Sequence, residues 1–165
     1  MTEVEFFTGV AEPLDFACRL VRKAYRKGAR LFITAPPQTL RSLDRALWVF
    51  DEREFVPHIK IEQRPQADDI RRPPPEGVEQ SGKATFAQGP LPAAAQRTPV
   101  WLSSGPRFEG APDVLINLGA EAPTDLAGIT RLIEIVSREV DEATRGRQRW
   151  RHYRELGLAI KHHGA

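Results

Sequence analysis

The segment VEFFTGVAEPLDFACRLVRKAYRKGARLFITA, residues 4–35, determines the fold that we expect. Its first apolar run, residues 4–7, ends just before Thr8-Gly9 and predicts a buried strand. Apolar residues then recur at helical spacing over residues 14–25, and Gly28 supplies a helix stop. The next run, residues 31–35, is apolar without alternation, which is typical of a strand covered on both faces. This strand-helix-strand order predicts an α/β fold with a mostly parallel sheet.

The rest of the chain continues the pattern. Pro36-Pro37 ends the second strand, and leucines at helical spacing predict a helix over residues 39–50. Residues 55–59 include a proline, so we expect an edge strand or a loop there. Further strands are expected at residues 100–104, 114–118 and 131–136, the last one half-buried because its apolar and charged residues alternate. A final helix at residues 139–156 precedes a short apolar tail, residues 158–160. We expect the strands at 4–7, 31–35 and 114–118 to be central and the later strands to give the sheet a mixed edge.

Residues 60–98 have a different character. Arg71-Arg72 and three consecutive prolines are followed by Gly, Ser, Gln and Ala with few apolar residues. Such a segment buries too little apolar surface to offset the entropy of ordering. We therefore expect one domain spanning residues 1–165, with a proline-rich irregular insert at about residues 60–98 and no regular structure at 68–94.

Composition excludes several classes of protein. The chain is 41% hydrophobic and 28% charged, no apolar run is long enough for a membrane span, and the acidic N-terminus does not resemble a signal peptide. One cysteine, Cys18, excludes an internal disulfide, and the four histidines lack zinc-site spacing. The turn after the first strand has neither phosphate-binding glycine motif. We expect a cytoplasmic protein without a metal, a cofactor or a catalytic site.

Positive charge gathers at the C-terminal end of the chain. Residues 138–165 contain seven Lys or Arg and four Asp or Glu, while the whole chain has a net charge of only +2. This asymmetry indicates an acidic partner or a phosphate backbone.

Three motifs of the chain are informative when they are taken together. The first is the aromatic-rich strand at residues 4–8. The second is LDRALW, residues 43–48, followed by FVPH, residues 55–58. The third is RQRWRHYRELG, residues 147–157. Together these motifs resemble the chi subunit of bacterial DNA polymerase III over nearly the whole chain. The resemblance implies a sheet like that of mononucleotide-binding folds. It also implies a non-catalytic replisome adaptor that links the clamp-loader complex to single-stranded-DNA-binding protein.

The resemblance implies two binding surfaces. Trp48, Phe55 and Pro57 match the surface on which the psi subunit docks. We expect Trp48 to be exposed, because it lies off the stripe of helix leucines. The second surface, at the final helix, receives the acidic C-terminal tail of single-stranded-DNA-binding protein, which ends in aspartates, a proline and a phenylalanine.

For that tail, arginines would pair with carboxylates and an apolar slot would hold the ring. Arg147, Trp150 and Arg154 lie three and four residues apart, so they share one helix face. By the resemblance, Arg147 and Trp150 match the family's arginine and aromatic residue, and Val136 matches an apolar residue on the preceding strand. A lysine of the family falls on Ala143, and Arg145 is a candidate substitute; Tyr153 completes the predicted set.

One alternative uses the same helix. Its arginines could contact phosphates, with Trp150 or Tyr153 as a stacking platform for single-stranded nucleic acid. Under the adaptor hypothesis, contact with nucleic acid is mainly indirect.

Overall fold

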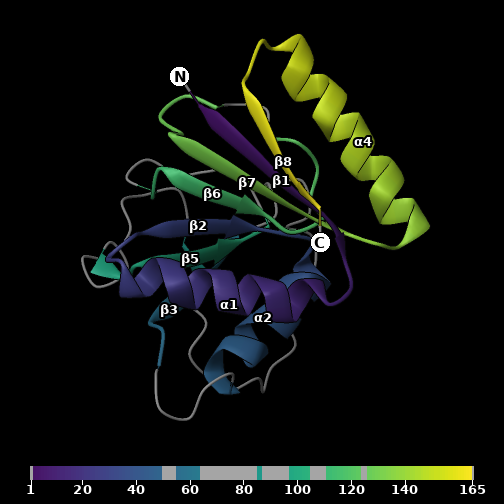
Figure 1. Cartoon of the computed structure of the whole chain (residues 1–165). Helices are drawn as coiled ribbons and strands as arrows, with labels where there is room; N and C mark the ends of the chain where they lie inside the picture. Colours follow the sequence, from purple (N-terminus) through teal and green to yellow (C-terminus); the bar gives the residue numbers. More distant parts are fainter. Residues whose placement is uncertain are drawn as a thin grey trace, which may run out of the picture.

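The architecture comes from a computed structural model, which describes residues 2–49, 55–63, 85–86, 97–104, 111–123 and 126–164. Eight strands within these residues form one sheet in the order β4-β3-β5-β2-β6-β7-β1-β8 (Figure 1). Their bounds are β1 (Glu3–Val10), β2 (Leu31–Thr34), β3 (His58–Gln63), β4 (Thr85–Phe86), β5 (Val100–Ser103), β6 (Val114–Asn117), β7 (Arg131–Ser137) and β8 (Ile160–Gly164). Every recorded strand pair is parallel. The α/β class is confirmed, and the predicted mixed edge is wrong.

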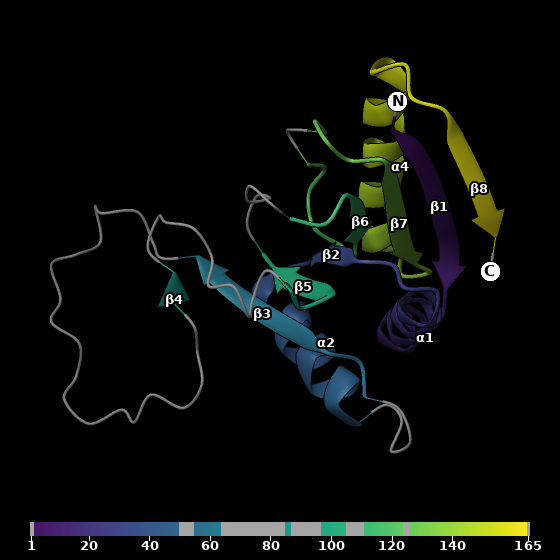
Figure 2. The ribbon, with the colours of Figure 1, turned by 90° about the vertical axis from the view of Figure 1, so that its left-hand side faces the viewer.

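Three helices in the described part of the chain cover the two faces of this sheet. They are α1 (Pro13–Arg26), α2 (Pro37–Val49) and α4 (Val140–Glu155). Helices α1 and α2 pack on one face, and α4 lies on the other face near β7 and β1 (Figure 2). Two helix boundaries follow from backbone chemistry. Pro13 opens α1, and Gly28, with φ +76°, allows the turn that ends it.

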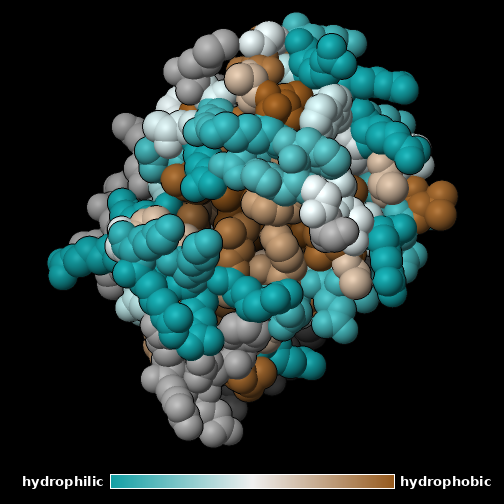
Figure 3. Space-filling model, in the orientation of Figure 1, coloured by the Kyte–Doolittle hydropathy of each residue, from teal (hydrophilic) through white to brown (hydrophobic). Residues whose placement is uncertain are grey.

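Two apolar clusters, one on each face, form the core. Leu31 and Ile33 of β2 pack with α1 and α2, whereas Phe32 between them packs in the cluster beneath α4. This division follows from the strand period of two residues. The prediction that apolar runs without alternation are covered on both faces is therefore confirmed. The outer surface over α1 is largely hydrophilic, with an apolar area near the centre of that view (Figure 3).

Strand β7 differs from its prediction. Residues 132–137 are all buried, including Glu134 at 0% exposure, so the strand is covered on both faces instead of half-buried. Ile133 and Ile135 face α1 and α2, and Leu132 and Val136 face α4. The alternation at Glu134 does not mark a solvent face, because that carboxylate lies beneath α4.

The C-terminal end of the chain is also more ordered than predicted. Residues 160–164 form β8, an edge strand parallel to β1, where the sequence predicted a short tail. The backbone N–H of Val4 donates to the carbonyl of Ala159 at 3.2 Å, and Lys161 pairs with Glu3. Five residues that alternate poorly and include two histidines gave no strand signal.

The insert begins later than predicted. Strand β3 continues to Gln63, and its end pairs with Thr85–Phe86 of β4, so regular structure is present inside both predicted ranges, 60–98 and 68–94. The expectation of an edge strand or loop at residues 55–59 is partly right, since β3 starts at His58, directly after Pro57, and lies next to the last strand of the sheet. Residues 64–84 and 87–96 lie outside the described residues.

Candidate functional site

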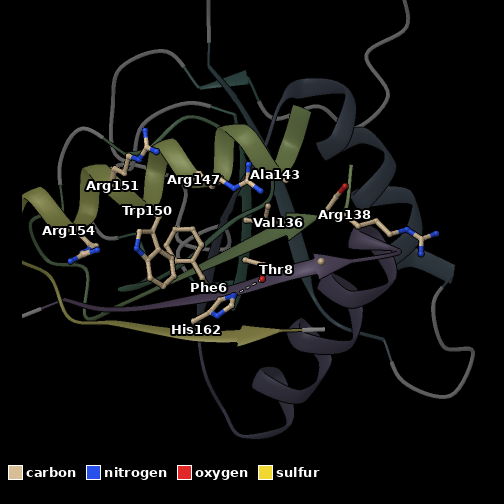
Figure 4. A pocket seen from close by; sticks show the side chains of 13 residues that line it. Phe6, Thr8, Val136, Arg138, Ala143, Arg147, Trp150, Arg151, Arg154 and His162 are labelled. Carbon is tan, nitrogen blue, oxygen red and sulfur yellow. Dashed lines mark hydrogen bonds between the residues drawn. The ribbon is translucent and has the colours of Figure 1, made fainter. Parts of the chain in front are cut away.

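A pocket lies between α4 and the strands β7, β1 and β8, with a volume of about 660 Å³ (Figure 4). Phe6 of β1 and Val136 of β7 are buried residues that line it, and the half-buried Trp150 of α4 packs on Phe6 with ring centroids 4.9 Å apart. The complete lining is Phe6, Thr8, Gly9, Val136, Ser137, Arg138, Ala143, Gly146, Arg147, Trp150, Arg151, Arg154 and His162. An apolar side chain of a ligand would therefore meet two aromatic rings and an aliphatic side chain.

Gly146 brings α4 close to the sheet at the floor of this pocket. A β-carbon at this position would lie 2.8 Å from Cγ1 of Val136, a distance that real side chains do not tolerate. The glycine therefore permits the close approach of α4 to β7, which sets the distance between Val136 and the arginines of the helix.

Four exposed arginines surround the pocket. Arg147, Arg151 and Arg154 project from α4, and Arg138 follows the end of β7 (Figure 4). None of the four guanidinium groups makes a hydrogen bond or an ion pair with any residue that the structure describes. Three other arginines of this region do have carboxylate partners, namely Arg131 with Glu5, Arg145 with Glu142 and Arg149 with Glu134. The pocket thus combines an apolar interior with unneutralised guanidinium groups at its mouth, a chemistry suited to an anionic ligand with an apolar end.

His162 of β8 forms the wall opposite the helix. Its Nε2 lies 2.6 Å from the hydroxyl oxygen of Thr8, and its ring meets Trp150 edge-on, with centroids 5.6 Å apart. His162 was not predicted as a site residue, because the sequence did not predict the strand that carries it.

A buried polar cluster fixes the orientation of α4. The carboxylate of Glu134 accepts hydrogen bonds from Arg149 Nε at 2.9 Å, the Tyr153 hydroxyl at 2.6 Å and the Asn117 side chain at 3.0 Å. Complete burial raises the pKa of the Glu134 carboxyl, and the Arg149 guanidinium together with the donated hydrogen bonds opposes that rise. Because α4 contributes two of the three donors, its rotation about its own axis is defined, and Arg147 and Trp150 face the pocket.

A separate aromatic surface lies on the other side of the sheet, where α2 ends. Trp48 is 60% exposed and Phe55 is 49% exposed, and their ring centroids are 4.9 Å apart. The leucines of α2 are buried instead, so the expected exposure of Trp48 is confirmed. Pro57, half-buried, precedes β3 beside this pair.

A contact between a histidine and a carboxylate explains why the two motif halves around Trp48 and Phe55 come together. The side chain of His58 is fully buried, and its Nε2 lies 3.0 Å from Oδ1 of Asp44, without hydrogen-bond alignment. Its other nitrogen, Nδ1, lies 2.8 Å from the carbonyl oxygen of Val56. Trp48 packs edge-on against the same imidazole, with centroids 5.2 Å apart. The acidic residue and the histidine of the motif therefore hold the aromatic pair in place.

Comparison with known proteins identifies the family. The chain matches the family described as DNA polymerase III chi subunit, HolC, over residues 1–79 and 84–161. The chain belongs to the DNA polymerase III chi subunit family. It is 30% identical over 168 residues to DNA polymerase III subunit chi of Pseudomonas aeruginosa, covering 99% of this chain and 96% of that protein. It is 28% identical over 144 residues to the protein of the same name from Haemophilus influenzae, covering 87% and 81%.

The residues carried over from the chi family divide into two groups in the structure. Val136, Arg147, Trp150 and Arg154 line one pocket, and their role in binding the tail stays a prediction. Tyr153 does not, and its predicted place at the binding surface is wrong. It is 0% exposed and its hydroxyl is bound to Glu134, so it supports the helix from below.

Arg145, also predicted to bind the tail, does not line this pocket of the chi-family chain. It pairs with Glu142 at 3.1 Å and lines a different cavity, together with Gln148, Arg149 and His152. Ala143 does line the pocket, at the position where the resemblance led us to expect a lysine. The additional positive charge comes from Arg138 and Arg151, which sequence reasoning did not assign. Arg151 lies four residues from Arg147 and was within reach of a helical-spacing argument.

Metal binding, thiol chemistry and membrane spans can each be checked in the described part of this chi-family chain. No group of three or more His, Cys, Asp or Glu side chains there could hold a metal ion. Cys18 is buried in the core, and burial raises the pKa of its thiol to about 11. Among the described helices, none combines the length and apolar content of a transmembrane segment.

Proposed function

We propose that this chain is a non-catalytic replisome adaptor, which holds the acidic C-terminal tail of single-stranded-DNA-binding protein in the pocket beneath α4. The observation that carries the proposal is the set of four exposed arginines whose guanidinium groups have no partner among the described residues, placed around a pocket with an apolar interior. Such an arrangement favours a ligand that is both anionic and aromatic. As a member of this family, the chain would act in the cytoplasm as part of the DNA polymerase III clamp-loader complex.

The tail chemistry fits the pocket in two parts. The terminal phenylalanine ring would lie among Phe6, Val136 and Trp150, where apolar burial and ring contacts stabilise it. The aspartates and the terminal carboxylate would pair with the guanidinium groups. Arg147 directly follows Gly146, the residue at which α4 comes close to Val136. Arginine suits this role because its planar fork binds a carboxylate through two parallel hydrogen bonds.

The aromatic surface formed by Trp48, Phe55 and Pro57 would bind a second partner, the psi subunit or another clamp-loader component. It carries two exposed aromatic rings held in place by the contact between His58 and Asp44, which is the composition of an anchor patch. It lies at the end of α2, on the opposite face of the sheet from α4, so both partners could bind at once.

The nucleic-acid alternative draws on the same arginines. Two observations weigh against it. Tyr153 is buried and cannot stack on a base, and Trp150 is packed between Phe6 and His162 instead of presenting an open face. Stacking platforms for single strands need exposed ring faces.

Titration of three ligands by isothermal calorimetry tests the proposal. The ligands are an acidic peptide ending in phenylalanine, the same peptide without that residue, and an oligonucleotide of equal charge. We expect binding of the first only, with an affinity that falls moderately with salt. Equal binding of all three, with a steep salt dependence, would support the nucleic-acid alternative instead.

A further inference from the structure

Strand β8 ends the sheet and has a neighbour, β1, on one side only. The Val4 N–H donates to the Ala159 carbonyl, which fixes the hydrogen-bonding phase of this parallel pair. Alternate residues of a parallel strand bond to the same neighbour. Lys161 and His163 therefore turn their backbone groups toward β1, whereas the N–H and C=O groups of Ile160, His162 and Gly164 point outward from the sheet.

The pocket reaches this open edge at His162. The side chain of His162 lines the pocket beside Thr8 and Trp150, while its backbone N–H and C=O belong to the outward set. One residue thus contributes to both surfaces, and a peptide leaving the pocket past His162 would come directly alongside β8 (Figure 4).

The edge is also accessible. Residues 161–164 are exposed, and they are not covered by any described segment. A lysine on an edge strand often prevents pairing with another strand. Here the Lys161 side chain is directed to Glu3, and His163 stacks on Phe7 and approaches Glu5 at 3.2 Å, so both side chains lean over β1 and away from the edge.

We propose that β8 binds the extended segment that precedes the anchored end of the acidic tail, which would add to the sheet as a further strand. This inference rests on the proposed function of the pocket. The continuity of edge and pocket at His162 selects the same ligand for both, and the exposed Arg154, which lines the pocket together with His162, favours an acidic chain. Main-chain hydrogen bonds would supply affinity that is independent of the tail's side chains, as in other cases of strand addition.

Two peptides test the inference separately from the proposed function. The short one contains only the acidic and aromatic end of the tail, and the long one extends it by five residues, the length of β8. We expect the long peptide to bind about tenfold more tightly, roughly 1.4 kcal/mol, and N-methylation of alternate residues in the extension to abolish the gain. In hydrogen-exchange NMR, the amides of His162 and Gly164 should become protected by the long peptide only.

Gly164 offers a matched pair of variants. Gly164→Pro removes the outward N–H without touching a bond to β1, and should reduce the long peptide to the affinity of the short one. Gly164→Ala keeps the N–H, and its β-carbon meets nothing within 4 Å, so the gain should persist. If neither peptide binds, the proposed function fails. If the short peptide binds and the extension adds neither affinity nor protection, strand addition is wrong. Protection of the same amides in an unliganded dimer would also overturn it, because a second copy would then occupy the edge.

Discussion

The hydroxyl of Tyr153 donates a 2.6 Å hydrogen bond to the carboxylate of Glu134, and both side chains are 0% exposed. Through this bond, β7 holds the helix that carries the pocket's arginines. The residue expected to contact the partner thus supports those that face the pocket.

Tyr153→Phe should lower the free energy of unfolding by about 1–3 kcal/mol, because one oxygen of a buried carboxylate loses a donor. Urea denaturation followed by circular dichroism measures it. Tyr25→Phe is the control, since Tyr25 is only half-buried on α1 and should change stability by less than about 0.5 kcal/mol. Equal effects of the two variants would show that the Glu134 cluster does not hold the helix.

Gly146→Ala should destabilise the chain and weaken peptide binding together. Alanine in a helix normally gains about 1 kcal/mol over glycine, but here its β-carbon would clash with Val136, and such overpacking costs about 1–3 kcal/mol. In a Val136→Ala background the clash is removed, so the same substitution should cost much less or become favourable. Thermal unfolding of the four proteins measures this coupling. Additive effects would contradict the close approach of α4 to β7.

Trp48→Ala should leave the free energy of unfolding within about 0.5 kcal/mol of the original and leave acidic-peptide affinity unchanged, since the ring is 60% exposed. The neighbouring Leu47→Ala is the contrast. Leu47 is 4% exposed, and its truncation should cost about 2–5 kcal/mol. Trp48→Ala should remain folded and yet lose its binding to a psi-like partner. A large loss of stability on removing Trp48 would place it in the core.

Cys18 should react slowly with thiol reagents at pH 8. Burial, and then the nearby Asp15 carboxylate, raise the pKa of the thiol from 9.0 to about 11, so almost no thiolate is present. This raised pKa contributes stability below the ordinary value of 9.0, and the contribution is lost as the pH rises through about 11. A colorimetric thiol assay with and without urea checks the accessibility. Rapid labelling of the folded chain at pH 8 would contradict the burial of Cys18.

Much of the fold was predictable because a continuous apolar run indicates a strand that is covered on both faces. Residues 4–7, 31–35 and 114–118 lack alternation because helices cover both faces of the sheet, and all three lie in interior strands. Strand β7 misled the prediction, since a buried glutamate looks like a solvent-facing one until its partners Arg149 and Tyr153 are known. Arg149 and Tyr153 follow Glu134 by 15 and 19 positions, and they lie on a helix whereas Glu134 lies on a strand. No local sequence pattern indicates such a pairing.

The site was predictable where helical spacing governs it. Arg147, Trp150 and Arg154 share a face, and Tyr153 was misplaced because it is also three positions from Trp150 on the helix surface, toward the buried side. Arg138 follows the end of β7 and His162 lies in the middle of β8. The sheet order brings both beside α4, and the spacing of residues along the sequence gives no indication of that.

The affinity of Arg147 variants for an acidic peptide ending in phenylalanine tests the central claim most directly. Loss of one partner of a charge-assisted pair should weaken binding at least about tenfold, ~1.4 kcal/mol, in Arg147→Ala, with partial recovery in Arg147→Lys because lysine lacks the planar fork. Arg41→Ala is the matched control, since Arg41 is an exposed arginine of α2 on the other face of the sheet. The account predicts an affinity unchanged by Arg41→Ala and reduced by Arg147→Ala. Equal affinities of the two variants would contradict it.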